Sequence, residues 1–250
     1  MLKKLSGLLH SVRNDATHKL FSYSIIHNSQ LNLTVLHSYT SYGLNLFPTA
    51  YMPPTVYFAL LLPCDTVVIE AQETFPKQTW RNRTAILSAQ GVLNLSIPVI
   101  KPHGNKTITA DIRIDATQKW QNNHWRAIES AYNKSPYFLY YKDAIKALIY
   151  SDEKSLLAYN CAFLRFFLAC FKMEKEIVFT EEYRFVPEDE DLRLRLTPKK
   201  PFLRSSEQFP AYYQVFSDRF PFVPNLSVLD LLVNEGPDGA GYLREVAERY

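Results

Sequence analysis

The chain has 250 residues, of which 47% are hydrophobic and 21% charged. This composition indicates a globular protein and excludes a disordered chain, because the apolar content is too high. The chain has only 7 glycines and neither G-x-x-x-x-G-K-[ST] nor G-x-G-x-x-G, which argues against a glycine-rich phosphate loop. The formal net charge of +3 is too small to indicate nucleic-acid binding.

The cysteines and the hydropathy of the chain indicate in which cellular compartment we expect the protein. The three cysteines are far apart and form no C-x-x-C pair, which predicts reduced core thiols in a cytoplasmic protein. No apolar run reaches about 18 residues, so we expect no transmembrane helix. No spacing of His, Cys, Asp and Glu is typical of a metal site, and we expect no metal and no cofactor.

The first elements predict a βαβ unit. Residues 1–44 are either an added strand–helix element or a poorly ordered extension, and both interpretations remain open. A short strand is predicted at Leu44–Ala50, an apolar helix from Val56 to Leu62, and a buried strand at Thr66–Ile69. Strand, helix and strand over this length are typical of a parallel, right-handed crossover.

A hairpin follows. Asn82–Leu87 and Val92–Val99 are strand candidates separated by Gln90-Gly91, which favours an antiparallel turn. Isoleucines at even spacing predict a further strand at Ile108–Ile114.

Helices dominate the second half of the chain. We expect helices at about Lys119–Tyr132, from Pro136 to about Tyr150, at Leu156–Met173, at about Ser227–Asn234 and at Asp238–Tyr250. Asp115 or Thr117 could cap the first of them. A returning strand is predicted at Ile177–Thr180, and the proline-rich residues 181–211 are predicted as a long exposed loop. The fold class is therefore α/β: one domain over residues 45–250, with a mixed sheet opened by a parallel βαβ unit, an antiparallel hairpin and a helical C-terminal half.

Cations gather in the segment Lys77-Gln78-Thr79-Trp80-Arg81-Asn82-Arg83. Arg forks suit carboxylate or phosphate, and Trp80 could stack on a sugar or base ring. Between Phe75 and Arg126 the chain has eight basic and two acidic residues, so the basic excess is local. Either an anion site or a solvated basic edge with Trp80 in the core fits this pattern.

Two further clusters carry potential chemistry. His124 lies in Trp120–Arg126, followed by Glu129, and is either a general base or a hydrogen-bonded structural residue. Ser227 lies in Asn225–Asp230; its spacing fits a helix N-cap better than the nucleophile of a triad with His124 and Asp230.

Taken in order, these segments resemble a known family. The run Tyr51-Met52-Pro53-Pro54-Thr55-Val56-Tyr57-Phe58-Ala59-Leu60 resembles the opening of the bacterial WbqC-like family, and Lys77–Arg83 matches its K-x-x-x-[WY]-R-N-R segment. Four more parts recur in the same order over about residues 46–243: Ile97-Pro98-Val99, Trp120 with His124-Trp125, Tyr132 with Pro136-Tyr137-Phe138, and Asn225–Asp230 with Asn234. Where many members have His-Gln-Pro-Asn, this chain has Phe47–Ala50, and where many have paired aspartates it has Glu70–Glu73.

The resemblance implies a place in bacterial envelope polysaccharide assembly, where some members are labelled glycine transferases of O-antigen synthesis. The first hypothesis is a cytoplasmic transferase that moves a small acyl or aminoacyl group onto a sugar nucleotide or lipid-linked sugar. The alternative is a non-catalytic binding protein for a phosphate- or carboxylate-bearing ligand in the same pathway; RNA binding is disfavoured by the small net charge. The candidate catalytic residues are His124 and Glu129, and the candidate binding residues are Tyr51, Tyr57, Lys77, Trp80, Arg81, Asn82, Arg83, Trp125, Asn225 and Asp230.

Overall fold

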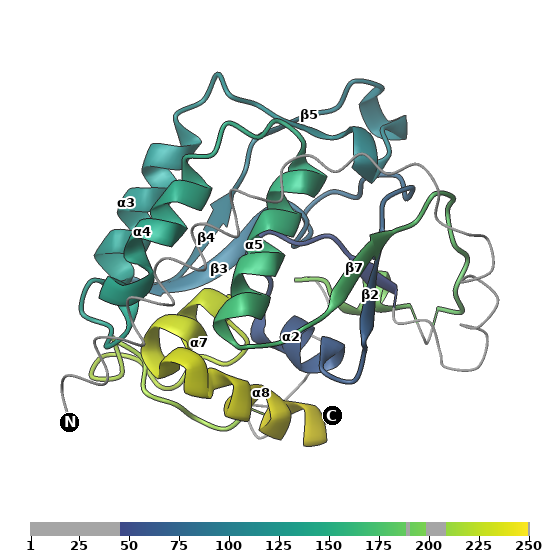
Figure 1. The fold of residues 1–250 in the computed structure, drawn as a ribbon. Coiled ribbons are helices and arrows are strands. Elements are labelled where there is room, and N and C mark those ends of the chain that lie inside the picture. Colours follow the sequence, from purple (N-terminus) through teal and green to yellow (C-terminus); the bar gives the residue numbers. More distant parts are fainter. Residues whose placement is uncertain (1–45, 189–190, 199–208, 250) are drawn as a thin grey trace. The chain divides into compact units, whose positions relative to one another are not determined.

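The computed structural model describes residues 46–188, 191–198 and 209–249 (Figure 1). The chain divides into two units, residues 1–44 and 45–250, and all the described elements belong to the second. Both interpretations of residues 1–44 therefore lie outside the described residues.

A three-stranded parallel sheet opens the fold. Its strands are β1 (Leu46–Pro48), β2 (Thr66–Glu70) and β7 (Glu176–Phe179), in the order β1-β2-β7. The helix α2 (Thr55–Leu61) connects β1 to β2, and both sheet pairings are parallel. The predicted βαβ unit is confirmed, and the returning strand near residue 177 joins its sheet.

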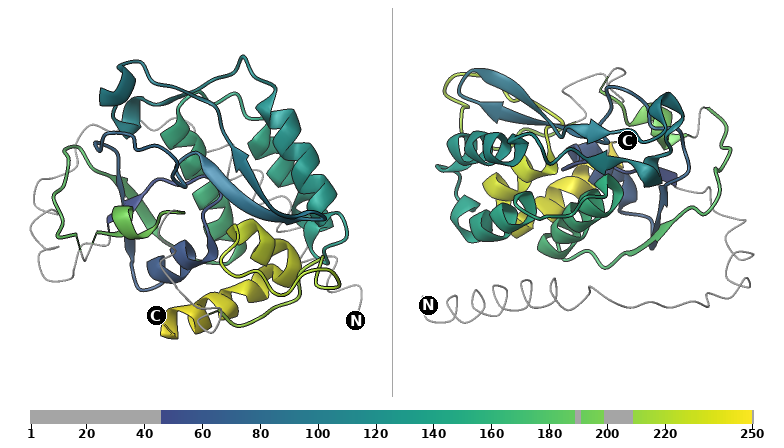
Figure 2. Two further views of the ribbon diagram at one scale, coloured as in Figure 1. Left: turned by 180° about the vertical axis from the view of Figure 1, so that it is seen from behind. Right: turned by 90° about the horizontal axis from the view of Figure 1, so that it is seen from above.

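The predicted hairpin is also confirmed. The strands β3 (Arg83–Ser88) and β4 (Gly91–Ser96) pair antiparallel around a turn at Gly91, whose φ of 100° suits glycine. The view from behind in Figure 2 shows this hairpin lying over the helices. The strand β3 is buried at four successive residues, because helices cover one face and residues 216–226 cover the other.

The prediction of one continuous strand at Ile108–Ile114 is wrong. Two 3₁₀ turns, η2 (Gly104–Lys106) and η3 (Thr109–Asp111), and two short paired strands, β5 (Val99–Ile100) and β6 (Arg113–Ile114), occupy this region. The amides of Thr109 and Ala110 donate to the carbonyls of Glu73 and Ala71. These tertiary bonds hold the backbone in a turn, so the even spacing of the isoleucines does not reflect a strand.

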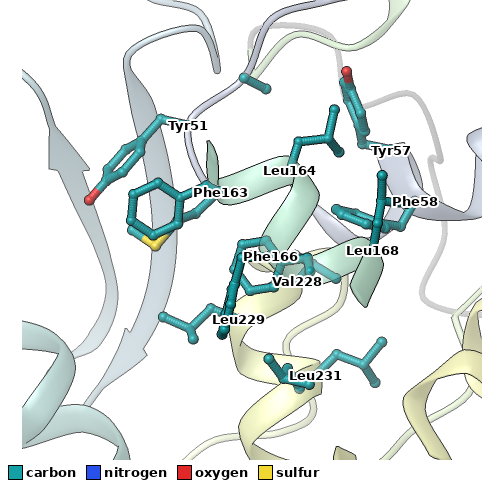
Figure 3. Close-up of a cluster of buried hydrophobic side chains, with 14 of the residues drawn as sticks. Tyr51, Tyr57, Phe58, Phe163, Leu164, Phe166, Leu168, Val228, Leu229 and Leu231 are labelled. Atoms are coloured by element: carbon teal, nitrogen blue, oxygen red, sulfur yellow. The ribbon is translucent and has the colours of Figure 1, made fainter. Parts of the chain in front are cut away.

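Three helices follow close to their predicted bounds: α3 (Trp120–Tyr132), α4 (Phe138–Ile149) and α5 (Leu156–Cys170). Neither Asp115 nor Thr117 caps α3; Asp115 instead accepts bonds from Thr117 in the preceding turn. Aromatic side chains of α5 form the centre of the core, between the loop after β1 and the start of α7 (Figure 3).

The C-terminal elements pack on this core. They are α6 (Leu192–Arg195), α7 (Val228–Glu235), η5 (Gly236–Asp238) and α8 (Gly239–Glu248), and α8 lies against α2. Residues 191–193 are buried, so this part of the predicted exposed loop at 181–211 is packed, because Arg193 forms internal ion pairs. Within the described ranges, no helix is both long and apolar enough to cross a membrane.

Candidate functional site

The loop after β1 ties together segments that are far apart in the sequence. The Met52 carbonyl accepts hydrogen bonds from Thr84 Oγ1 at 2.8 Å and Ser227 Oγ at 3.0 Å. The Ser227 amide donates to the Ala85 carbonyl, and the Thr55 amide donates to the Leu226 carbonyl. Two segments that resemble the family, Tyr51–Leu60 and Asn225–Asp230, thus meet the start of β3 in one polar network around this loop.

Asn225 and Ser227 are helix caps in this network. Ser227 Oγ accepts from the Leu229 amide at 3.2 Å and so caps α7, as the spacing favours. Asn225 Oδ1 accepts from the Val56 amide at 3.0 Å, which caps α2 from a distant part of the chain. Among the described residues, the hydrogen-bond partners of the His124 side chain are Tyr51 and Ser96, so the structure does not assemble a triad with Ser227 and Asp230.

His124 is buried and fully bonded. Its Nε2 lies 3.2 Å from the Ser96 carbonyl, and its Nδ1 lies 3.0 Å from the Tyr51 hydroxyl. Because a carbonyl only accepts, Nε2 carries the proton and Nδ1 accepts from the phenol. Burial lowers the pKa of His124 to about 4, so the imidazole is neutral near pH 7, with both nitrogens engaged.

Arg81 has a carboxylate partner inside the chain. Its Nε lies 2.6 Å from Glu73 Oε1 and its Nη2 lies 2.7 Å from Glu73 Oε2, and only 1% of Arg81 is exposed. The Arg81 carbonyl accepts from Asn160 Nδ2 at 2.7 Å. The binding of an external anion by Arg81 stays a prediction. In the structure, the Glu73 carboxylate occupies the guanidinium of Arg81.

The other residues of the segment Lys77–Arg83 differ in their exposure and in their partners. Lys77 is exposed, and Trp80 is half-buried and packs against the core. Asn82 Nδ2 donates to the Ile97 carbonyl at 2.8 Å. Arg83 is half-buried, and within the described part of the chain its Nε is enclosed without a partner. Lys77 and Arg83 are therefore the cluster members with charge not matched by a described carboxylate.

Two predicted aromatic binding residues belong to the core. The Tyr57 hydroxyl donates to the Pro48 carbonyl at 2.9 Å. Trp125 is buried against Phe138, and Lys146 Nζ lies 5.4 Å from its ring centroid. These contacts give both side chains a packing role.

The carboxyl end of the parallel sheet, where ligands bind in many open α/β sheets, is filled. Glu70 Oε2 accepts from Arg193 Nη1 at 2.9 Å, and Glu70 Oε1 accepts from Thr180 Oγ1 at 2.6 Å. A cavity of about 10 Å³ remains between Thr49, Ile69 and Asn160, enough for about one water molecule.

A groove that the sequence did not indicate lies beside the C-terminal half of α3. It has a volume of about 530 Å³, within the range of small-ligand sites. Its lining joins the turn of the hairpin, α3 and the segment before α7: Ala89, Arg126, Glu129, Ser130, Ala131, Asn133, Lys134, Val215 and Phe216. Glu129 is the one predicted site residue in this lining. Val215 and Phe216 are distant in sequence from α3, so no local pattern relates them to it.

Comparisons with known proteins agree with the resemblance. The model of the WbqC-like protein family matches residues 49–200. A protein of Mycobacterium tuberculosis named "Uncharacterized protein Rv1507c" is 28% identical over 228 residues, which cover 78% of this chain and 94% of that protein. No solved structure matches. Within the described ranges, no group of three or more His, Cys, Asp or Glu residues could hold a metal ion.

Proposed function

Because this chain belongs to the WbqC-like family, we propose that it binds a phosphate- or carboxylate-bearing ligand in the groove beside α3. The supporting observation is the charge of the groove lining. Glu129 Oε1 lies 2.6 Å from Lys142 Nζ, which offsets its charge. In the described structure, Arg126 and Lys134 have no carboxylate within ion-pair distance, so the lining presents two unmatched positive charges.

The opposite wall of the groove suits a ring. Phe216 and Val215 are apolar. Ser130 on α3 and Asn133 directly after it supply hydrogen-bonding groups. A ligand that combines an anionic group with a ring, such as a sugar nucleotide, matches both walls. We place this binding in envelope polysaccharide synthesis on the ground of the family resemblance.

The state of His124 favours binding over base catalysis. A general base must have a nitrogen free to take a proton from the substrate, and both nitrogens of His124 are bonded within the chain. Its lowered pKa of about 4 also makes it a weak base at pH 7. His124 does not line the groove.

Titration calorimetry with a uridine diphosphate hexose and with inorganic phosphate tests the proposal. Arg126→Ala should weaken binding by about 1.5–3 kcal/mol, the contribution of a charged hydrogen bond. Lys119→Ala, at the other end of α3, is the matched control and should bind as the parent does. Unchanged binding by Arg126→Ala together with loss in Arg83→Ala would assign the anion to the Lys77–Arg83 cluster instead.

A transferase is the second candidate, because Glu129, a predicted catalytic residue, lines the groove beside Arg126. A carboxylate there could accept the proton of a sugar hydroxyl or amine that attacks the acyl carbonyl of a thioester donor, whose carbon–sulfur bond breaks and whose thiolate leaves. Glu129→Gln should then retain ligand binding and lose transfer of an acyl or aminoacyl group to the bound sugar. Transfer at the parent rate by Glu129→Gln would reject Glu129 as the base.

A further inference from the structure

The outer edge of the hairpin strand β4 has no described strand beside it. Among the described strands, β4 pairs with β3 alone. The opposite edge of the hairpin is occupied, because the Ser227 amide donates to the Ala85 carbonyl on β3. The view from behind in Figure 2 shows the hairpin in front of the helices. An unpaired edge presents a row of N–H and C=O groups and can therefore pair with a strand of another chain.

The hydrogen-bond register shows which backbone groups this edge presents. The Ile97 amide donates to the Asn82 carbonyl at 2.8 Å, and along an antiparallel pair hydrogen-bonded and non-hydrogen-bonded residue pairs alternate. Val92 and Asn94 lie an odd number of residues from Ile97, so their N–H and C=O groups point away from β3. Neither residue has a described hydrogen bond on that side.

The strand lacks the features that usually block edge pairing. No residue between Arg83 and Lys101 is charged, and Pro98 lies beyond the end of the strand. The register of the hairpin runs without a bulge. Val92 and Leu93 are 51% and 38% exposed. Natural edges are commonly protected by charges, prolines or bulges, and the absence of all three on β4 indicates that this edge has a partner.

The pattern of β4 is complementary to itself. In an antiparallel pairing about a two-fold axis at Leu93, Val92 lies opposite Asn94 of the second copy, so both outward-facing residues exchange hydrogen bonds. Leu93 meets its own copy in a non-hydrogen-bonded pair, where apolar side chains pack closely. Because the strand is neutral, no like charges meet. We propose that the chain forms a homodimer in which β3 and β4 of both copies make one antiparallel sheet.

The extent of the free edge sets the expected affinity. The Ser96 carbonyl accepts from His124 Nε2, so the pairing is confined to the part of β4 nearer the turn. A contact through one strand edge is smaller than the about 1,200–2,000 Å² of standard interfaces, and we expect a dissociation constant of about 10–100 μM. No residue of β4 lines the groove beside α3, so the dimer does not depend on ligand binding there.

Analytical ultracentrifugation of the full chain tests the dimer. From about 1 to 500 μM, a range that spans the expected dissociation constant, the average mass should rise from 29.0 kDa towards twice that value. Val92→Lys brings like charges to the pairing edge and should weaken association by about tenfold or more. Leu139→Lys, at a 79% exposed position of α4, is the matched control and should associate as the parent does. A parent that stays monomeric, or equal association by Val92→Lys, would overturn the proposal.

Single cysteines locate the two-fold axis. Residues opposite each other in a non-hydrogen-bonded antiparallel pair have Cα atoms about 4.5 Å apart, which suits a disulfide. Leu93→Cys should therefore give a covalent dimer on mild oxidation. Asn94→Cys, which does not face its own copy, should cross-link far less, and the parent reports any cross-linking by the native cysteines. Equal cross-linking by the two variants, or none by Leu93→Cys, would contradict the pairing at Leu93.

Discussion

The Tyr51 hydroxyl donates to His124 Nδ1 across 3.0 Å, and through this bond the loop after β1 is joined to α3. The opposite nitrogen of the same ring then donates to the Ser96 carbonyl at the end of β4. A neutral imidazole is needed for both bonds, because Nδ1 must accept while Nε2 donates. His124 therefore connects a loop, a helix and a hairpin only in its neutral form.

We expect acid to destabilise the fold through His124. Burial lowers its pKa from 6.5 to about 4, so between these values the unfolded chain binds a proton that the folded chain does not. The stabilisation is complete above pH 6.5 and is lost as the pH falls, by about 3 kcal/mol in total near pH 4. Urea unfolding from pH 4 to 7 measures this loss.

The variant His124→Gln isolates this effect from other titrating groups. It should be less stable than the parent at pH 7, and the difference between the two proteins should shrink towards pH 4. A pH-independent difference would contradict a neutral, low-pKa His124.

The buried ion pair of Arg81 and Glu73 should be sensitive to loss of one partner. Glu73→Gln leaves a guanidinium buried without a counter-charge, and we expect a loss of about 3–5 kcal/mol in unfolding free energy. Glu129→Gln breaks the partly exposed pair with Lys142 and should cost less than about 1 kcal/mol. Chemical denaturation measures both losses in unfolding free energy. Similar losses in the two variants would contradict a larger stability contribution from the buried pair of Arg81 and Glu73.

Asn225 should contribute both a cap and a backbone conformation. It has a positive φ of 55° and accepts from the Val56 amide. Asn225→Ala loses the cap and is strained at this φ, so we expect a cost of about 1–3 kcal/mol. Asn225→Gly loses only the cap and should be the less damaging variant in thermal unfolding, whereas the reverse order would rule out backbone strain as the cause.

Gln214 should hold one wall of the groove in place. Its Oε1 accepts from the Val223 amide at 2.9 Å and its Nε2 donates to the Val223 carbonyl at 3.0 Å, which closes the loop that carries Phe216. Gln214→Ala should lower stability by about 1–3 kcal/mol, because buried backbone groups lose their partners, and should weaken ligand binding in the groove. Scanning calorimetry measures the loss of stability, and titration calorimetry measures the weaker ligand binding. The exposed Gln118→Ala variant is the control for both measurements.

Local patterns in the sequence determined most of the elements. The β-branched run at Thr66–Ile69, the alternation around Gln90-Gly91 and the apolar spacing of Leu156–Met173 predicted β2, the hairpin and α5 correctly. Each depends on residues close together in the chain, because strand and helix periodicities repeat over a few residues. The capping role of Ser227 was favoured for the same reason.

Tertiary structure alone decided which polar residues are partnered within the chain. Arg81 meets Glu73, and His124 meets Tyr51 and Ser96. Arg81 and His124, which belong to two separate polar segments of the sequence, are therefore both buried. The groove joins residues of α3 to the segment before α7. The sequence showed a local excess of cations between Phe75 and Arg126. Which of them face a cavity depends on contacts between distant segments, because burial and counter-charge are set by packing rather than by sequence spacing.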